Sequence, residues 1–170
     1  MNSEHSGFSQ PPSISTLVGY ITGPKAEQPV GVRVVEPPSG TRQKQRGKMY
    51  AVVDLAGDHP DNAAISDHLL TVIQRTYYTD KGSQSNVMIE ALRRAHQVIQ
   101  EINERYPDSA LRAGVLCAAL LNDRLVIVAS GSAMALVRIT DQVQMFPSEL
   151  LSAPDADGDV PMQVFRQKLR

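Results

Sequence analysis

Residues 113–129 read A-G-V-L-C-A-A-L-L-N-D-R-L-V-I-V-A, and this stretch decides the fold. Two apolar runs, 113–121 and 125–129, flank the polar turn N-D-R. Short apolar runs on either side of such a turn are typical of buried strands joined as an antiparallel hairpin. A second polar turn, S-G-S, leads to a third apolar run at 133–139, and residues 143–146 follow as a short β-rich segment. We therefore predict three consecutive antiparallel strands and a short edge strand.

Toward the N-terminus, two more β-rich segments precede this group. Residues 14–21, I-S-T-L-V-G-Y-I, and 30–35, V-G-V-R-V-V, are separated by the turn-forming T-G-P-K, which predicts an opening hairpin. Residues 36–47 follow as a loop. The loop carries three basic side chains, those of Arg42, Lys44 and Arg46. Because no aromatic residue is interleaved there to stack on bases, we interpret it as a solvated loop.

Between the two groups of strands, the spacing of apolar residues becomes helical. A strand at 49–53 ends at Asp54, and a first helix is then expected, with Asp61 or Asn62 capping its first turn. Its inward positions are Ile65, Leu69, Val72 and Thr76. A second helix, from 87 to 102, carries an apolar stripe that we expect to pack on the sheet. The stripe consists of Val87, Met88, Ala91, Leu92, Ala95, Val98, Ile99 and Ile102. The order of strands, two helices and strands indicates an α+β fold with helices on one face of an antiparallel sheet.

The composition limits the class of protein. The chain has 170 residues, with 17 basic and 18 acidic side chains and a formal net charge of -1. This length fits one domain, and the near-neutral charge disfavours nucleic acid or a membrane surface as a partner. Residues 1–13 are polar and rich in Ser and Pro, so we expect a disordered tail before one domain at 14–170.

The N-terminus and the one cysteine bear on the cellular compartment. Cys117 lies in an apolar run, which predicts a buried core position, and a single cysteine excludes an internal disulfide. The N-terminus lacks the basic start and apolar core of a signal peptide, and no run approaches membrane-spanning length. We therefore expect a cytoplasmic protein.

These features together resemble a known family. A strand ending in Asp with Gly and His shortly after, two amphipathic helices, and the strands from residue 113 are similar to the type 2C metal-dependent protein serine/threonine phosphatases, the PPM family. The resemblance extends from the first hairpin to about Phe146. It implies an antiparallel β-sandwich with flanking helices, of which the second half is missing here. It also implies aspartates that hold two Mn²⁺ or Mg²⁺ ions, which activate water for attack on phosphoserine or phosphothreonine.

The first motif of the family, D-G-x-G-G-H, is only partly present. Asp54 occupies the position of the aspartate that bridges the metal ions, and Gly57 and His59 also match. Leu55 stands where the family has the first Gly, and Asp58 where it has the second Gly of the pair. We expect Asp54 to be either a vestigial metal ligand or a carboxylate at the start of a helix.

The second motif, G-D-S-R-A-Y, has lost its charged residues. Residues 131–136 read G-S-A-M-A-L, so Ser132 replaces the carboxylate and Met134 replaces the arginine. The family's Asn-Glu-Asp triplet is absent from residues 23–47. We expect no catalytic residue, because one carboxylate cannot hold two divalent ions against water.

Other chemistry-bearing residues give weaker signals. His68 and His96 lie in the predicted helices without a partner at metal-binding spacing, so we expect surface or boundary positions. The S-G-S segment, Ser130, Gly131 and Ser132, is best explained as a hairpin turn.

We therefore expect a catalytically inactive phosphatase-like domain without a cofactor, which has a binding or regulatory role with a protein partner in phosphorylation-dependent signalling. One alternative is an active Mn²⁺- or Mg²⁺-dependent protein serine/threonine phosphatase whose remaining ligands lie beyond residue 170 or in another subunit. A second is a homo-oligomeric assembly module, such as a homodimer, because a shortened sandwich would expose strand edges.

Overall fold

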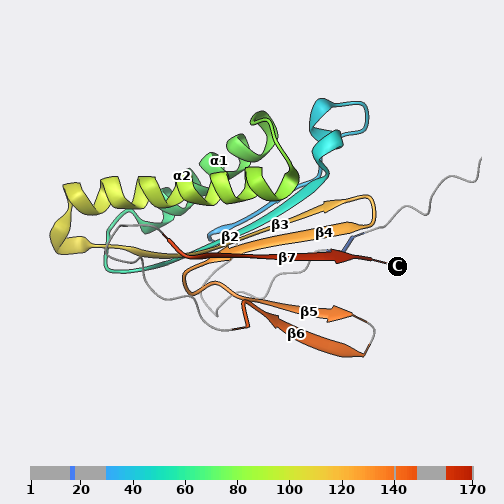
Figure 1. The fold of residues 1–170 in the computed structure, drawn as a ribbon. Coiled ribbons are helices and arrows are strands. Elements are labelled where there is room, and N and C mark those ends of the chain that lie inside the picture. The colour runs from blue at the N-terminus through green and yellow to red at the C-terminus, as the bar shows by residue number, and fades with distance from the viewer. Residues whose placement is uncertain (1–15, 18–29, 140, 149–159, 170) are drawn as a thin grey trace, which may run out of the picture.

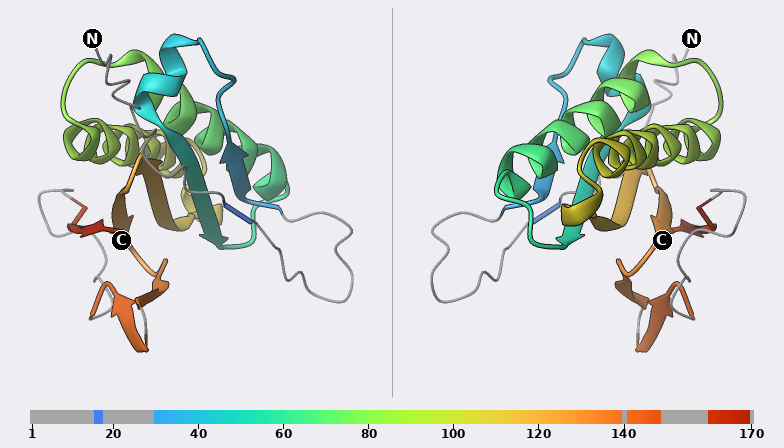
Figure 2. Two further views of the ribbon diagram at one scale, coloured as in Figure 1. Left: turned by 90° about the vertical axis from the view of Figure 1, so that its right-hand side faces the viewer. Right: turned by 90° about the vertical axis from the view of Figure 1, so that its left-hand side faces the viewer.

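A five-stranded antiparallel sheet carries two helices on one face and a β-hairpin below the other (Figure 1). The two side views in Figure 2 show the same three layers. This computed structural model describes residues 16–17, 30–139, 141–148 and 160–169. The predicted tail at 1–13 lies outside these residues, as does most of the predicted strand at 14–21. Within the described residues, neither long helix is long and apolar enough to cross a membrane.

The large sheet has the strand order β1-β2-β3-β4-β7. Its strands are β1 Val32–Val35, β2 Lys48–Ala56, β3 Arg112–Leu121, β4 Arg124–Ser130 and β7 Met162–Lys168. The small sheet consists of β5 Ala135–Ile139 and β6 Gln142–Phe146. The helices are α1 Asn62–Thr79 and α2 Gln84–Arg105, with short 3-10 turns η1 Arg42–Arg46 and η2 Pro107–Ser109. The predicted α+β fold is confirmed.

The central hairpin, β3–β4, is confirmed, but the strand predicted to follow it belongs to another sheet. Leu121 pairs with Arg124 across a two-residue turn in which Asn122 has φ 54°. After β4 the chain leaves the large sheet, and β5 pairs with β6 instead. The place beside β4 is taken by β7, where Ile127 pairs with Phe165. Prediction from adjacent segments alone missed this pairing, because β7 lies far along the chain.

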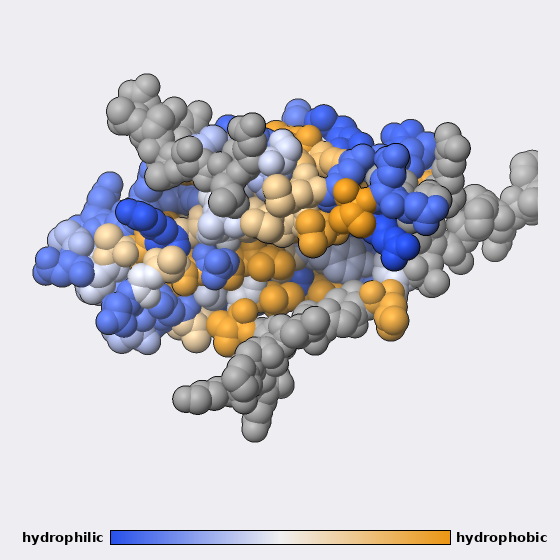
Figure 3. Space-filling view, turned by 90° about the horizontal axis from the view of Figure 1, so that it is seen from below, coloured by the Kyte–Doolittle hydropathy of each residue, from blue (hydrophilic) through white to orange (hydrophobic). Residues whose placement is uncertain are grey.

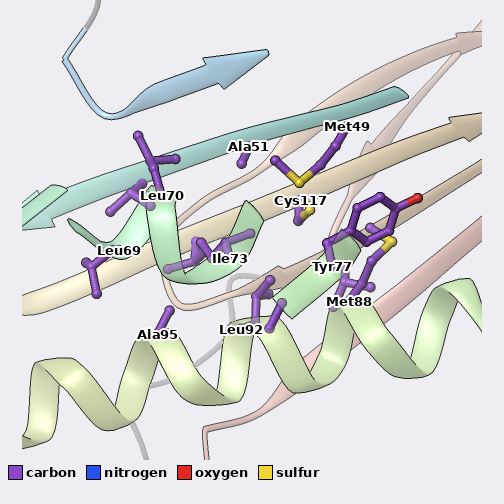
Figure 4. Packing of buried hydrophobic residues seen from close by; sticks show 14 of the residues in the cluster. Met49, Ala51, Leu69, Leu70, Ile73, Tyr77, Met88, Leu92, Ala95 and Cys117 are labelled. Atoms are coloured by element: carbon purple, nitrogen blue, oxygen red, sulfur yellow. The ribbon is translucent and has the colours of Figure 1, made fainter. Parts of the chain in front are cut away.

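The main core lies between the helices and the large sheet. Figure 4 shows side chains of α1 and α2, among them Ile73, Tyr77 and Leu92, pointing toward the sheet. The predicted stripe of α2 faces this core, with Leu92, Ala95 and Ile99 at 0%, 1% and 5% exposure. Cys117 is fully buried as predicted, and burial raises the pKa of its thiol to about 12.

A second, smaller core lies between the large sheet and the β5–β6 hairpin. Phe146 of β6 packs on Phe165 of β7, with ring centroids 5.7 Å apart. The other buried members of this core are Leu116, Ile127, Ala129, Ala133 and Val137. Figure 3 shows this side of the molecule, where hydrophobic residues gather in the middle. The hairpin therefore covers one face of the sheet with apolar side chains.

We expect Leu92→Ala to lower the free energy of unfolding by about 2–5 kcal/mol, because removing a fully buried side chain leaves a cavity beneath α2. Urea denaturation followed by circular dichroism measures this. Leu136→Ala is the matched control, because Leu136 is 71% exposed and its truncation should change stability by less than about 0.5 kcal/mol. Equal effects of the two substitutions would contradict the packing of α2 on the sheet.

Candidate functional site

Asp54 lies inside strand β2, and no helix begins beside it. Leu55 and Ala56 continue the pairing of β2 with β3, and α1 begins only at Asn62. The interpretation of Asp54 as a carboxylate at the start of a helix is therefore wrong. The strand continues through the acid because alternate residues of β2 face away from the helices. Asp54 is exposed, whereas its neighbour Val53 is buried.

The backbone of β3 brings Ser132 close to the strand position opposite Asp54. Asp54 pairs with Gly114 in the register of β2 and β3. A Cβ atom built on Gly114 would lie 2.5 Å from Ser132 Oγ and 2.7 Å from Ala133 N. Any larger residue at position 114 would therefore displace the turn after β4. Asp54 and Ser132, the two motif positions picked out in the sequence, thus flank the same glycine.

A second glycine allows the same close approach from the other side. Gly131 has φ 63°, and a Cβ atom on it would lie 2.4 Å from the carbonyl oxygen of Ala113. Ser130 ends β4 and a turn follows it, but this turn links two different sheets, so the prediction of a hairpin turn is wrong. We call the group of Asp54, Gly114, Gly131 and Ser132 the Asp54 end of the sheet.

The loop that follows β2 is held by three local contacts. His59 Nδ1 accepts a hydrogen bond from the backbone N–H of Asp61 at 3.1 Å, and its ring makes a T-shaped contact with that of Tyr106, with centroids 5.4 Å apart. The amide of Asn62 donates to the carbonyl oxygen of Gly57 at 2.9 Å. Asp61 is the N-cap residue of α1, but its side chain makes no capping hydrogen bond. Asp61 is therefore the N-cap residue as predicted, while the side chain of Asn62 holds the loop through its hydrogen bond to Gly57.

The donor set at the Asp54 end does not fit the two-metal centre that the family resemblance implies. A two-metal site for Mg²⁺ or Mn²⁺ needs several converging oxygen ligands, most of them carboxylates. Within the described parts of the chain, no three His, Cys, Asp or Glu side chains lie together as such a site would require. Ser132 supplies a neutral hydroxyl where the family has a carboxylate. No metal-dependent step can be derived from these residues.

A buried polar pair lies just behind this end of the sheet. His96 Nε2 of α2 lies 2.7 Å from Ser130 Oγ of β4, and the two residues are 8% and 0% exposed. His68 is exposed as expected, but the surface or boundary prediction for His96 is wrong. His96 lies one helical turn from both Leu92 and Ile99 on the buried stripe, and that periodicity was the available signal. Burial lowers the pKa of the His96 imidazole.

The sheet, helix pair and hairpin have the architecture of PPM-type serine/threonine phosphatases, as comparison with solved structures shows. The serine/threonine phosphatase PstP/Ppp of Mycobacterium tuberculosis matches with a TM-score of 0.58 and 13% identity, over 82% of this chain and 72% of its own. The catalytic domain of PstP in complex with two manganese ions matches with a TM-score of 0.59 and 13% identity, over 82% and 71%. PppA, a key regulatory component of T6SS in Pseudomonas aeruginosa, matches with a TM-score of 0.60 and 10% identity, over 84% and 67%.

These likenesses confirm the predicted PPM-like fold. At 10% to 13% identity they establish the fold alone, and they transfer no residue's role to this chain. No family model and no curated protein matches the sequence.

We expect the stability of the protein to fall as the pH is lowered from about 7 toward 5, in part through His96. Its pKa is below the ordinary 6.5 in the folded state, so the unfolded chain binds the proton more readily. The contribution of neutral His96 to stability is therefore fully present above the pKa that His96 has in the unfolded chain. It is lost as the pH falls toward the lower pKa of the folded state. Urea titrations across this range, compared between the wild type and His96→Gln, measure it. An unchanged pH slope in His96→Gln would contradict the assignment.

Proposed function

We propose that this chain is a catalytically inactive PPM phosphatase-like domain, a pseudophosphatase, that binds a protein partner in phosphorylation-dependent signalling. The proposal places it in the cytoplasm, where its single cysteine stays reduced. The fold supports the class, because PstP is a serine/threonine phosphatase and PppA is a regulatory component.

One observation carries the proposal. At the Asp54 end, Gly114 and Gly131 allow the backbone segments to approach closely. The side chains available there as ligands are the exposed carboxylate of Asp54 and the hydroxyl of Ser132. Gly114 and Gly131 bring the turn after β4 against β3, as a site there would require. This close approach of the turn and β3 supports a surface that binds a phosphorylated group but lacks the metal ions that would hydrolyse it.

We expect negligible Mn²⁺- or Mg²⁺-dependent hydrolysis of p-nitrophenyl phosphate or of phosphoserine and phosphothreonine peptides, because Ser132 cannot replace a carboxylate ligand. Phosphate release at saturating metal concentration measures turnover, and fluorescence anisotropy measures binding of the same peptides. Phosphorylation-dependent binding without phosphate release supports the proposal. Metal-dependent turnover that is abolished by Asp54→Ala would establish the active enzyme instead.

A variant that restores a carboxylate at position 132 tests this explanation. Ser132→Asp should raise the affinity for Mn²⁺ by at least about tenfold, because two carboxylates would then flank Gly114. The double variant Ser132→Asp with Asp54→Asn should lose this gain. Calorimetric titration with Mn²⁺ compares the three proteins. If Ser132→Asp does not raise the affinity for Mn²⁺, the close approach at Gly114 does not bring positions 54 and 132 together as we propose.

Homo-oligomeric assembly is a second candidate, favoured by the outer face of the β5–β6 hairpin. Leu136 and Val143 are 71% and 62% exposed, and Met145, which pairs with Leu136 in the hairpin, is 46% exposed. An apolar face of this kind is expected at a protein interface, and two copies could cover each other's hairpins. The edge strand β7 is a weaker surface for assembly, because Val164 and Phe165 pack into the two cores.

If the hairpin face mediates assembly, sedimentation at rising concentration will show a mass above the 18.6 kDa of one chain. Leu136→Glu should shift the protein toward the monomer, because a charge would then be buried in the interface. Gln97→Glu, an exposed position on α2, is the matched control and should leave the mass unchanged. A monomer at every concentration tested rejects this candidate.

A further inference from the structure

A hollow of about 480 Å³ opens at the end of the sheet opposite Asp54. It lies between η1, the connection from α1 to α2, and the last residue of β3. Figure 1 shows η1, in cyan, at the end of the molecule where α1 finishes and α2 begins. The residues that line the hollow include Arg42, Gln45, Arg46, Tyr78, Gln84 and Leu121. We call it the η1 pocket.

The wall of the η1 pocket is fixed by hydrogen bonds to Arg46. Its guanidinium group donates to the carbonyl oxygen of Gly82 at 2.9 Å and also to that of Asp80. Its own carbonyl oxygen accepts from the hydroxyl of Tyr77 and from the amide of Gln84 at 3.3 Å. The 3-10 turn is therefore tied to the helix connection from both sides. A site held in this way loses little conformational entropy when a ligand binds.

These contacts correct part of the sequence interpretation of the basic segment. Arg42 and Lys44 are exposed, as a solvated loop predicts, but Arg46 is half-buried. The segment itself has no aromatic residue, yet α1 supplies Tyr78, whose hydroxyl donates to the carbonyl oxygen of Gly47 at 3.0 Å. Burial raises the pKa of this hydroxyl, so it stays protonated and remains a donor.

The η1 pocket has an excess of positive charge. Arg46 is bonded to carbonyl groups, which are dipoles and do not neutralise its charge. In the described part of the chain, no carboxylate lies within ion-pair distance of Arg42 or Arg46. The nearby carboxylate of Asp80 is already paired with Arg94 at 2.8 Å. Two arginines therefore border the pocket, and no carboxylate of the described residues pairs with either of them.

We propose that the η1 pocket binds a phosphate monoester that carries an aromatic or aliphatic group. Guanidinium groups match the geometry of phosphoryl oxygens, which they bind through paired, charge-assisted hydrogen bonds. Tyr78 and Leu121 provide apolar surface for the organic part, and Gln45 provides a neutral hydrogen-bonding group. The volume falls within the range of about 300–1,000 Å³ that is usual for small-molecule sites. This site is separate from the Asp54 end and does not depend on the proposed function.

Calorimetric titration with phenyl phosphate, inorganic phosphate and phenol tests the proposal. We expect phenyl phosphate to bind more tightly than either fragment, and its affinity to fall as salt screens the arginines. Arg42→Gln should weaken binding by about tenfold, the size of one charge-assisted hydrogen bond. Arg42 is exposed and forms no ion pair with the described residues, so we expect its replacement to leave the fold intact. Arg105→Gln, an exposed arginine at the far end of α2, is the matched control and should have no effect.

Two further comparisons separate the source of the phosphate and the location of the site. A phosphoserine peptide that binds better than phenyl phosphate, and loses this affinity in Arg42→Gln, indicates a phosphorylated protein; the reverse order indicates a small molecule. The loss of affinity caused by Arg42→Gln should be the same in an Asp54→Asn background, which distinguishes this site from the Asp54 end. Absence of binding by every probe at millimolar concentration, phenol binding equal to that of phenyl phosphate, or equal affinity of the wild type and Arg42→Gln overturns the proposal.

Discussion

Strand β3 is buried on both faces, and the other elements are arranged around that burial. Val115, Cys117 and Ala119 face the helices, while Leu116 faces the β5–β6 hairpin. A strand without a polar face must be paired on both edges and covered on both sides, because its peptide groups and apolar side chains must all be removed from water. Strands β2 and β4 provide the pairing, and the helices and hairpin provide the cover. Small side chains such as Cys117 and Ala119 let α2 approach closely.

The same strand separates the two candidate sites. Gly114, near its start, lies against the Asp54 end, and Leu121, its last residue, lines the η1 pocket. Each site is formed where strands finish and loops from distant parts of the chain converge. Between them lies a close-packed core that leaves little room for substitution. Changes in chemistry at one end can therefore accumulate with little effect on the other, and the altered donor set at Asp54 is compatible with an intact fold.

The sequence predicted those parts of the fold that depend on neighbouring residues. The β3–β4 hairpin and helix α2 were predicted correctly, because the N-D-R turn and the apolar stripe are local patterns. The place of β7 beside β4 was missed, because that pairing joins segments that are far apart in the sequence. The extension of β2 past Asp54 was missed because an acid is tolerated on the solvent face of a strand.

The candidate sites show the same division. The motif comparison picked out Asp54 and Ser132, since each lies in a short recognisable segment. The pairing of His96 with Ser130 joins a helix to a strand far along the chain, and a histidine within an apolar stripe is easily assigned to the surface. The η1 pocket was not predicted, because Arg46 and Tyr78 come from separate elements and meet only in the folded chain.

The thiol of Cys117 makes the central strand observable without any label. In the folded protein it is fully buried and its pKa is raised to about 12, so almost no reactive thiolate exists at neutral pH. In an unfolded chain the thiol has its ordinary pKa and is open to alkylating reagents. The chain contains one cysteine, so no second thiol contributes to the signal. The rate of alkylation therefore reports how often β3, the most protected part of the molecule, becomes transiently exposed.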